Sequence, residues 1–194
     1  VRRDMPENME DRIVERMKFL ADRARYYRDI IDTEETMLER TENLGKVVAD
    51  TAERLCAVGP MVRYVGLQGD VRLNDPYAAY DEVPFDIVTR KEGDVHALLQ
   101  LRLDELIVSA NMVSYAVKHL PEGPIRVKIP PIIPAGEHSS HCEAPRGEIF
   151  YYVRSGGGRT PERVKARTPT LANLPTALEI LKGATIADVP VVLT

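Results

Sequence analysis

The strongest candidate for chemistry in this chain is an arginine that lies between a proline and a glycine. Pro145 fixes its own backbone torsion, and Gly147 allows the backbone to approach another group closely. Arg146 between them presents a rigid fork of donors and a charge that it keeps at neutral pH. We therefore expect Arg146, together with Pro145, to lie over a reacting centre. A structural ion pair between Arg146 and nearby Glu143 is the alternative.

A second candidate site is the glycine-rich and proline-rich stretch 59–90, which contains several charged residues and phenols. Its main candidates are Arg63, Asp70, Arg72, Tyr77 and Tyr80. Such side chains can line a polar cleft or an interface between proteins. An ion-pair network that only holds an irregular loop in place is the alternative.

Two further motifs lack the residues that a ligand site needs. Gly156-Gly157-Gly158 has no following lysine or helix, so we expect a hairpin connection and not a phosphate loop. His138, His141 and Cys142 do not have a standard metal-ligand spacing, and no second ligand pair is near. We therefore predict a polar loop and no metal site.

The composition narrows the class of protein. The 194 residues carry a net charge of -4, which argues against nucleic acid as a partner. No apolar run reaches the roughly 20 residues that a membrane span needs, so we expect no direct span. Cys56 and Cys142 lie far apart and outside any CxxC pair, and two reduced thiols are expected, with a disulfide as the alternative.

Two long amphipathic helices are predicted to position these residues. One covers residues 7–32 and a shorter helix covers 34–40. The other begins after Asp94, which can cap it, and runs to about Leu120. Each has an apolar seam with spacings of four and three residues, and matching seams predict that the helices pack side by side. The seams are Ile13, Met17, Leu20, Ala24, Tyr27 and Ile31, and Leu99, Leu103, Leu106, Ala110, Val113, Val117 and Leu120.

The remaining elements are short, and they predict an α+β fold: a long-helix bundle followed by a small antiparallel β section and a short helix. Residues 143–147 are expected to form a charged turn. We expect a helical part over residues 1–123, with the irregular region 59–90, and a β-rich part over 124–194, both in one truncated domain. The predicted short elements are a helix from Asp50 or Thr51, strands at 85–88, 125–129, 148–154, 163–167 and 189–193, and a helix at 174–181.

Five ordered segments resemble one protein family. They are "GPMVRYVGLQGDVRLNDPYAAYDEVPFDI", "LPEGPI", "EAPRGEIFYYV", "RVKARTPTLANL" and "LKGATIADVPVVL". The family is the large-subunit family shared by energy-converting, membrane-bound NiFe hydrogenases and the quinone-site (D-type) subunit of respiratory complex I. The hydrogenase branch is more similar, because the complex I branch usually has lysine at the position of Arg146 and lacks the Thr-Pro-Thr.

The resemblance implies roles for five residues. Pro145 and Arg146 would overhang a nickel–iron cluster, with Arg146 above the open metal position. Pro169 and Thr170 would border the cyanide ligands of the iron, and the Thr170 hydroxyl would donate to a buried cyanide nitrogen. Glu143 is expected among the residues around the cluster.

The sequence departs from the family because neither of the two CxxC pairs that hold the cluster is present. We therefore expect a central and C-terminal fragment that binds no cluster and is inactive alone. The intact enzyme would couple hydrogen evolution or oxidation to ion translocation, as a peripheral subunit on the cytoplasmic side of the membrane. Its partners would be a small subunit with iron–sulfur clusters and membrane-arm subunits. The alternatives are a complex I-like subunit in quinone reduction and a metal-free scaffold or assembly protein.

Overall fold

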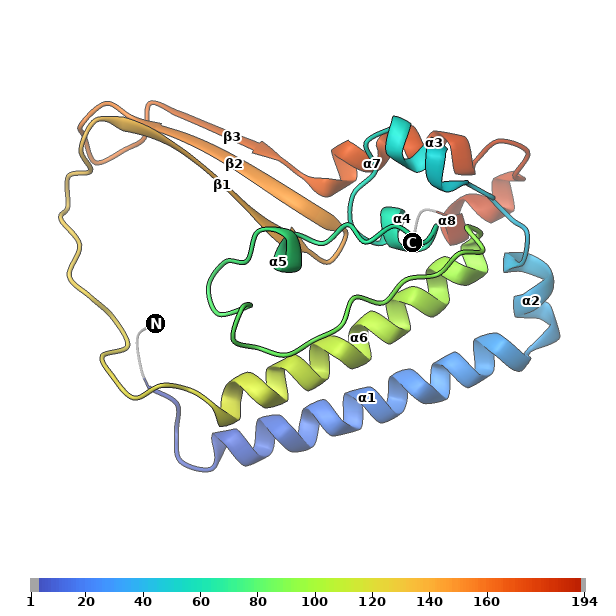
Figure 1. Cartoon of the computed structure of the whole chain (residues 1–194), viewed down its shortest axis with the longest axis horizontal. Coiled ribbons are helices and arrows are strands. Elements are labelled where there is room, and N and C mark those ends of the chain that lie inside the picture. Colours follow the sequence, from blue (N-terminus) through green and yellow to red (C-terminus); the bar gives the residue numbers. More distant parts are fainter. Residues whose placement is uncertain (1–3, 193–194) are drawn as a thin grey trace.

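The structure, a computed structural model, describes residues 4–192 and combines helices with one antiparallel sheet. Figure 1 shows the two long helices side by side along the bottom, the sheet at the upper left, and most of the short helices at the right. The predicted α+β class is confirmed. The helices are α1 (Met9–Thr33), α2 (Glu35–Thr41), α3 (Ala49–Arg54), α4 (Pro60–Arg63), α5 (Val71–Asn74), α6 (Val95–Lys118), α7 (Pro169–Ile180) and α8 (Val189–Val192).

Helices α1 and α6 lie side by side and run in opposite directions, as the matching seams predict (Figure 1). Arg28 of α1 forms an ion pair with Asp104 of α6 at 2.5 Å. One turn away, Gln100 of α6 donates to Asp32 of α1 at 2.7 Å. The predicted cap is also confirmed, because the Asp94 side chain accepts from the backbone N–H of Ala97 at 2.9 Å.

The deepest core lies on a different face of α6 from the predicted seam. Val95, Leu98 and Leu101 are buried, whereas Leu106 and Val113 of the seam are 37% and 41% exposed. Helix α6 therefore packs both against α1 and, through Val95, Leu98 and Leu101, into the main core. The buried apolar residues of that core are Val47, Ala52, Met61, Tyr64, Val65, Val95, Leu98, Leu101, Ile180 and Val192.

The stretch between α3 and α6 contains only the short helices α4 and α5, and the strand predicted at 85–88 does not form. Within residues 4–192, no strand lies beside it to complete a ladder. Phe85 instead packs under the guanidinium of Arg72, whose central carbon lies 5.0 Å from the ring centre. Side-chain contacts therefore hold this segment where backbone pairing was expected.

The sheet has three strands in the order β1 (Gly136–Ala144), β2 (Gly147–Ser155) and β3 (Arg163–Arg167), all antiparallel. The predicted strands at 148–154 and 163–167 and the glycine-rich hairpin between them are confirmed. The turn predicted over 143–147 was wrong for residues 143 and 144, which complete β1. The polar loop predicted around His138, His141 and Cys142 was also wrong, because these residues lie in β1. Polar residues can form this strand because most of the sheet is exposed and needs no apolar face.

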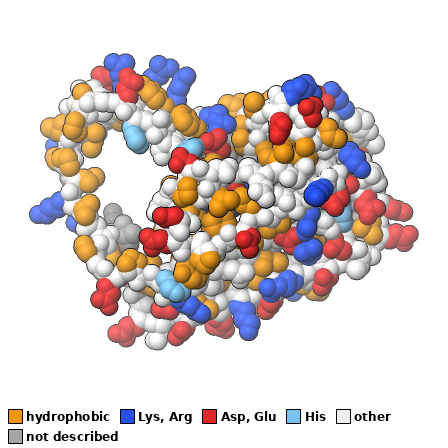
Figure 2. Space-filling view, in the orientation of Figure 1, with side chains coloured by type: hydrophobic (Ala, Val, Ile, Leu, Met, Phe, Trp, Pro, Cys, Tyr) orange, Lys and Arg blue, Asp and Glu red, His pale blue; other side chains and the backbone are white. Residues whose placement is uncertain are grey.

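An exposed arch over residues 119–135 joins α6 to β1, and Figure 2 shows an opening between this arch and the body. The strand predicted at 125–129 does not form because the segment has no strand beside it. The predicted boundary between a helical part (1–123) and a β-rich part (124–194) falls within the arch. This division of the chain stays a prediction. Prolines keep the arch extended, namely Pro121, Pro124, Pro130, Pro131 and Pro134.

The last segment is more helical than expected. Helix α7 begins at Pro169 and not at Leu174, because Thr168 caps it and proline is favoured at the first helical position. The strand predicted at 189–193 was wrong, since residues 186–192 form a 3-10 turn and then α8. Leu193, the last residue of that predicted strand, lies outside the described residues.

Two smaller predictions concern cysteines and membrane spans. Cys56 and Cys142 are both free thiols, as expected from their spacing. Among the helices of residues 4–192, none combines the length and the apolar character that crossing a bilayer requires.

A substitution at Leu101 tests whether the buried core lies where the structure places it. Leu101 is 0% exposed, so Leu101→Ala should lower the free energy of unfolding by about 2–5 kcal/mol through lost burial and a new cavity. Urea denaturation of the purified protein measures this change. The matched control is Leu178→Ala, at a residue that is 60% exposed, which should change stability by about 0.5 kcal/mol or less. Equal losses in the two variants would contradict the assignment.

Candidate functional site

Arg146 lies in the tight turn of the β1–β2 hairpin, where Pro145 and Arg146 connect the paired residues Ala144 and Gly147. The turn packs directly against the backbone of Gly59. A Cβ added at Gly59 would lie 2.2 Å from the Cα of Gly147, and both glycines have positive φ angles, +67° and +120°. Neither position accepts a larger residue without movement of the backbone. The close approach fixes the turn against the body of the protein.

Asn173 of α7 joins the same two segments by hydrogen bonds. Its Nδ2 donates to the carbonyl oxygens of Val58 and Arg146, both at 3.1 Å, and its Oδ1 accepts from the N–H of Val58 at 2.8 Å. Asn173 is buried, so these bonds are shielded from water. Sequence reasoning missed this residue. One feature of the sequence could have identified it: in "TLANL", the polar amide of Asn173 lies between the apolar residues Ala172 and Leu174.

The turn and α7 border a cavity of about 320 Å³ that Arg146 and Thr170 both line. Thr170 is the second residue of α7, and the buried Pro169 before it starts the helix. Arg102 of α6 is the third polar side chain that reaches the cavity, and it was not predicted. Asn173 and the apolar residues Met61, Leu98, Leu174, Ala177 and Val192 complete the lining.

The structure excludes the ion pair between Arg146 and Glu143 that was the alternative prediction. Glu143 accepts from Arg63 Nη1 at 2.9 Å, and Arg146 has no ion pair with any residue in the range 4–192. Pro145 and Glu143 line a neighbouring cavity of about 380 Å³, and Arg102 lines both cavities. The residues predicted around one centre are therefore divided between two adjoining cavities.

Arg63 is the centre of a buried network that draws on four segments of the chain. Its guanidinium contacts Glu105 at 2.6 Å, Glu143 at 2.9 Å and Asp70 at 3.2 Å, and its side chain is only 2% exposed. It also donates to the carbonyl oxygen of Gly69 at 2.7 Å. The network contains more carboxylates than its guanidinium groups neutralise.

The charges of this network shift the pKa of its members. Burial raises the pKa of Glu143 above its usual range, although the contact with Arg63 opposes this change. Burial lowers the pKa of Arg63, but Glu105 and Glu143 outweigh burial and the pKa rises. Burial and the nearby charge of Asp70 thus outweigh Arg63, and the pKa of the Glu143 carboxyl group lies above that of an exposed glutamate.

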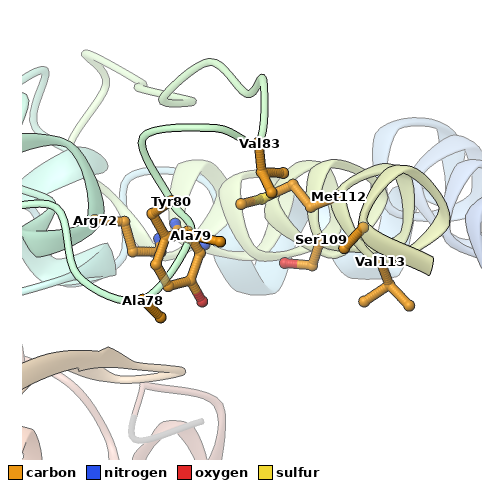
Figure 3. A pocket seen from close by; sticks show the side chains of 9 residues that line it. Arg72, Ala78, Ala79, Tyr80, Val83, Ser109, Met112 and Val113 are labelled. Atoms are coloured by element: carbon orange, nitrogen blue, oxygen red, sulfur yellow. The ribbon is translucent and has the colours of Figure 1, made fainter. Parts of the chain in front are cut away.

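The other residues predicted in the stretch 59–90 lie around this network. Arg72 donates to both carboxylate oxygens of Asp70, at 2.9 and 2.6 Å, and the Tyr77 hydroxyl accepts from the N–H of Glu143 at 3.0 Å. Figure 3 shows Tyr80 beside Arg72 at a cavity of about 330 Å³ against α6. These contacts hold the irregular loop in place, and the function of the residues as a cleft or an interface stays a prediction.

His141 forms part of a separate polar cluster on the exposed sheet. It contacts Asp75 and Glu148, each at 2.7 Å, and Glu148 also pairs with Arg167 at 2.5 Å. His138 lies three residues away on the same strand, so the two imidazoles project from opposite faces. Among the described residues, no group of three His, Cys, Asp or Glu side chains is arranged to hold a metal ion.

A family model agrees with this arrangement of elements. The model described as "Respiratory-chain NADH dehydrogenase, 49 Kd subunit" matches residues 1–134 and 127–194. The chain belongs to this family. The predicted resemblance to the complex I and membrane-bound hydrogenase large subunits is therefore confirmed.

Individual members of the 49 kDa family carry different names. The chain is 32% identical, over its full length and 55% of the relative, to a D-type subunit of NADH-quinone oxidoreductase from Sinorhizobium medicae (strain WSM419). It is 34% identical, over 84% of the chain and 45% of the relative, to "Carbon monoxide-induced hydrogenase" of Rhodospirillum rubrum. The chain spans about half the length of these relatives.

A chain in a solved structure of a respiratory membrane complex has the same fold. That structure is the "Structure of the membrane-bound sulfane sulfur reductase (MBS), an archaeal respiratory membrane complex", and the chain in it matches with a TM-score of 0.90 and 32% identity. The match covers 100% of the present chain and 54% of that chain. The arrangement of helices and hairpin described above is therefore the fold of this part of the 49 kDa family.

Asn173→Ala should loosen the turn that carries Arg146. The variant loses three part-buried hydrogen bonds and leaves the N–H and the carbonyl oxygen of Val58 without this partner, so stability should fall by about 1–3 kcal/mol. Hydrogen exchange should accelerate at the Val58 amide. The control is Asn111→Ala, at an exposed residue of α6, which should leave this exchange unchanged. Unaltered protection of Val58 in Asn173→Ala would refute the role of Asn173.

His141→Gln should destabilise the protein mainly at low pH. Hydrogen bonds to Glu148 and Asp75 raise the pKa of His141 above its usual value of about 6.5, so the folded state holds its proton more tightly. This stabilisation is fully present below about pH 6.5 and is lost as pH rises through the higher pKa. The side chain is 33% exposed, so the effect should be about 1 kcal/mol or less. Unfolding free energies at several pH values test it, and a difference that grows with pH would contradict it.

Proposed function

We propose that this chain forms the Arg146 side of the active site in the large subunit of a membrane-bound NiFe hydrogenase. The observation that carries the proposal is that Arg146, whose guanidinium has no carboxylate partner among residues 4–192, lines one cavity together with Thr170. The complete enzyme would couple hydrogen evolution or oxidation to ion translocation. The match to a carbon monoxide-induced hydrogenase and the arginine in "APRG" support this branch.

The polar groups of the cavity fit the surroundings of a nickel–iron cluster. Cyanide nitrogens on the iron are acceptors that need donors when buried, and Arg146 and Thr170 both offer donors. The thiolate ligands have no counterpart here, since Cys56 is exposed and neither free cysteine lines this cavity. We infer that the complete subunit supplies them from residues beyond this chain. When bound, such a cluster provides the metal centre for heterolytic hydrogen cleavage.

The residues of this chain act on the site through charge, orientation and exclusion of water. Arg146 supplies a fixed positive field, because its backbone is held by Asn173 and by the contact between Gly59 and Gly147. Apolar residues such as Leu98 and Met61 exclude water from the opposite wall and strengthen that field. Glu143, in the adjoining cavity, is suited to hold a proton near the site.

The proposed partners follow from the same assignment. A small subunit with iron–sulfur clusters would exchange electrons with the site, and membrane-arm subunits would carry the ion translocation. The chain would be a peripheral subunit on the cytoplasmic side of the membrane. The solved relative in a respiratory membrane complex supports such an assembly.

Quinone reduction is the second candidate, because the family model and several relatives are named for NADH dehydrogenase or NADH-quinone oxidoreductase. The same donors, Arg146 and Thr170, can bind the carbonyl oxygen of a quinone head group. Metal analysis of the purified complete complex separates the two functions. Stoichiometric nickel with hydrogen turnover supports the hydrogenase, and quinone-dependent turnover without nickel supports the second candidate.

Arg146→Lys in the complete complex tests the proposed role of the guanidinium. Lysine keeps the charge but loses the rigid fork, so hydrogen turnover should fall by about 100-fold or more while nickel content stays nearly unchanged. A hydrogen-electrode or dye-reduction assay measures turnover, and elemental analysis measures nickel. The control is Arg154→Lys on the exposed sheet, which should retain turnover. Full activity of Arg146→Lys would remove the basis of the proposal.

A further inference from the structure

Three titratable side chains share one face of the β1–β2 hairpin. His141 and Glu143 are two residues apart on β1, so they project from the same face, and Glu148 of β2 is the register partner of Glu143. All three line one cavity of about 290 Å³, together with Asp70 and Asp75. The hairpin thus gathers acidic and basic groups around a space that is large enough for several water molecules.

The groups around this cavity form a series from exposed to buried. Asp75 is 73% exposed and His141 33%, whereas the Glu143 side chain is 5% exposed. Glu143 also lines the neighbouring cavity of about 380 Å³, to which Arg102 contributes, and Arg102 in turn lines the cavity of Arg146. Glu143 therefore lies between the His141 cavity and the space beside Arg146.

His141 is placed to take up and release protons. Its two ring nitrogens lie 2.7 Å from carboxylate oxygens of Asp75 and Glu148, and Arg167 is the further charged group that pairs with Glu148. Ionised carboxylates only accept hydrogen bonds, so both nitrogens donate and the ring in this arrangement carries two N–H groups. Either nitrogen can therefore give up its proton while the other keeps the ring bound to a carboxylate.

Glu143 can exchange a proton without leaving its position. Its two carboxylate oxygens accept from Arg63 and from the backbone N–H of Val71, and its own backbone N–H donates to the Tyr77 hydroxyl. When one oxygen carries a proton, the other oxygen still accepts a hydrogen bond. Burial raises the pKa of Glu143, so it takes up a proton at a higher pH than an exposed glutamate does.

We propose that Glu143 and His141 form a proton-transfer route between the cavities beside Arg146 and the surface of this part of the protein, with water in the shared cavity between them. This inference rests on the proposed function, because hydrogen oxidation releases protons and electrons in equal number. The electrons leave to the iron–sulfur clusters of the partner subunit. Each proton forms an O–H bond at Glu143. That bond breaks when the proton passes through water to His141, whose ring has already given up a proton toward Asp75 and solvent. Hydrogen evolution uses the same steps in reverse.

Glu143→Gln in the complete complex tests the inner end of the route. Glutamine can still accept from Arg63 and Val71 but cannot carry the proton, so hydrogen turnover should fall by about 100-fold or more while nickel content stays nearly unchanged. The ratio of turnover in H2O to turnover in D2O should rise, because proton transfer becomes rate-limiting. Glu143→Asp keeps a carboxyl group and should retain more turnover than Glu143→Gln.

The matched control for Glu143→Gln is Glu137→Gln, at the exposed end of β1, which should retain wild-type turnover and the wild-type isotope effect. Wild-type turnover in Glu143→Gln would overturn the proposal.

His141→Ala tests the outer end of the route and lies outside the Arg63 network, so it serves if Glu143→Gln does not assemble. Turnover should fall by about tenfold or more. Added imidazoles should restore it to an extent that follows their pKa values, because the rate of proton transfer depends on the acidity of the transferring group. The control is His138→Ala, on the opposite face of the same strand, which should keep turnover and gain nothing from imidazole. Wild-type turnover in His141→Ala, or restoration that is independent of the pKa of the added base, would contradict the route.

Failure of the route and failure of the proposed function give different results. If Arg146→Lys keeps full turnover while Glu143→Gln and His141→Ala are impaired, the route stands and the proposed role of Arg146 does not. If the complete complex reduces quinone without nickel, the same variants are assayed for quinone turnover, which takes up protons. Wild-type quinone turnover in both variants would then exclude the route, and impaired turnover would support it.

Discussion

Arg63 carries a full positive charge in a part of the protein that water hardly reaches, and its side chain is only 2% exposed. A buried charge is tolerated only when it is paired and hydrogen-bonded, so the surrounding segments must bring carboxylates to it. Asp70 precedes α5, Glu105 lies on α6 and Glu143 lies on β1. One guanidinium thus fixes the irregular stretch after α4, the long helix and the hairpin relative to one another.

This arrangement also decides the charge of the cavities beside it. Because Arg63 and Arg72 take up the nearby carboxylates, Arg102 and Arg146 face the neighbouring space without ion pairs among the described residues. The network around Arg63 therefore has an excess of carboxylates, and the neighbouring cavity is lined by the positive charges of Arg102 and Arg146. A buried carboxyl group with a raised pKa, Glu143, and the guanidinium groups of Arg102 and Arg146 thus line adjoining cavities.

The hairpin turn is held by backbone geometry and not by its own side chains. Gly59 and Gly147 are in direct contact, and Asn173 bridges both segments. Arg146 can therefore remain exposed at the cavity while its backbone is fixed. The rest of the hairpin and the arch before it are largely exposed, and these surfaces are available for the other subunits that a multisubunit assembly would contain.

The sequence by itself determined the two long helices, the strands β2 and β3, the helix cap at Asp94 and the family. These follow from local patterns, namely apolar spacing, capping residues and ordered motifs. Only the tertiary structure decided that Glu143 pairs with Arg63 and not Arg146, that Asn173 holds the turn, and that Arg102 joins the site. Segments at 85–88, 125–129 and 189–192 have strand-like composition but do not form strands. Strand formation and ion pairing both depend on which distant segment lies alongside, and a local pattern does not contain that information.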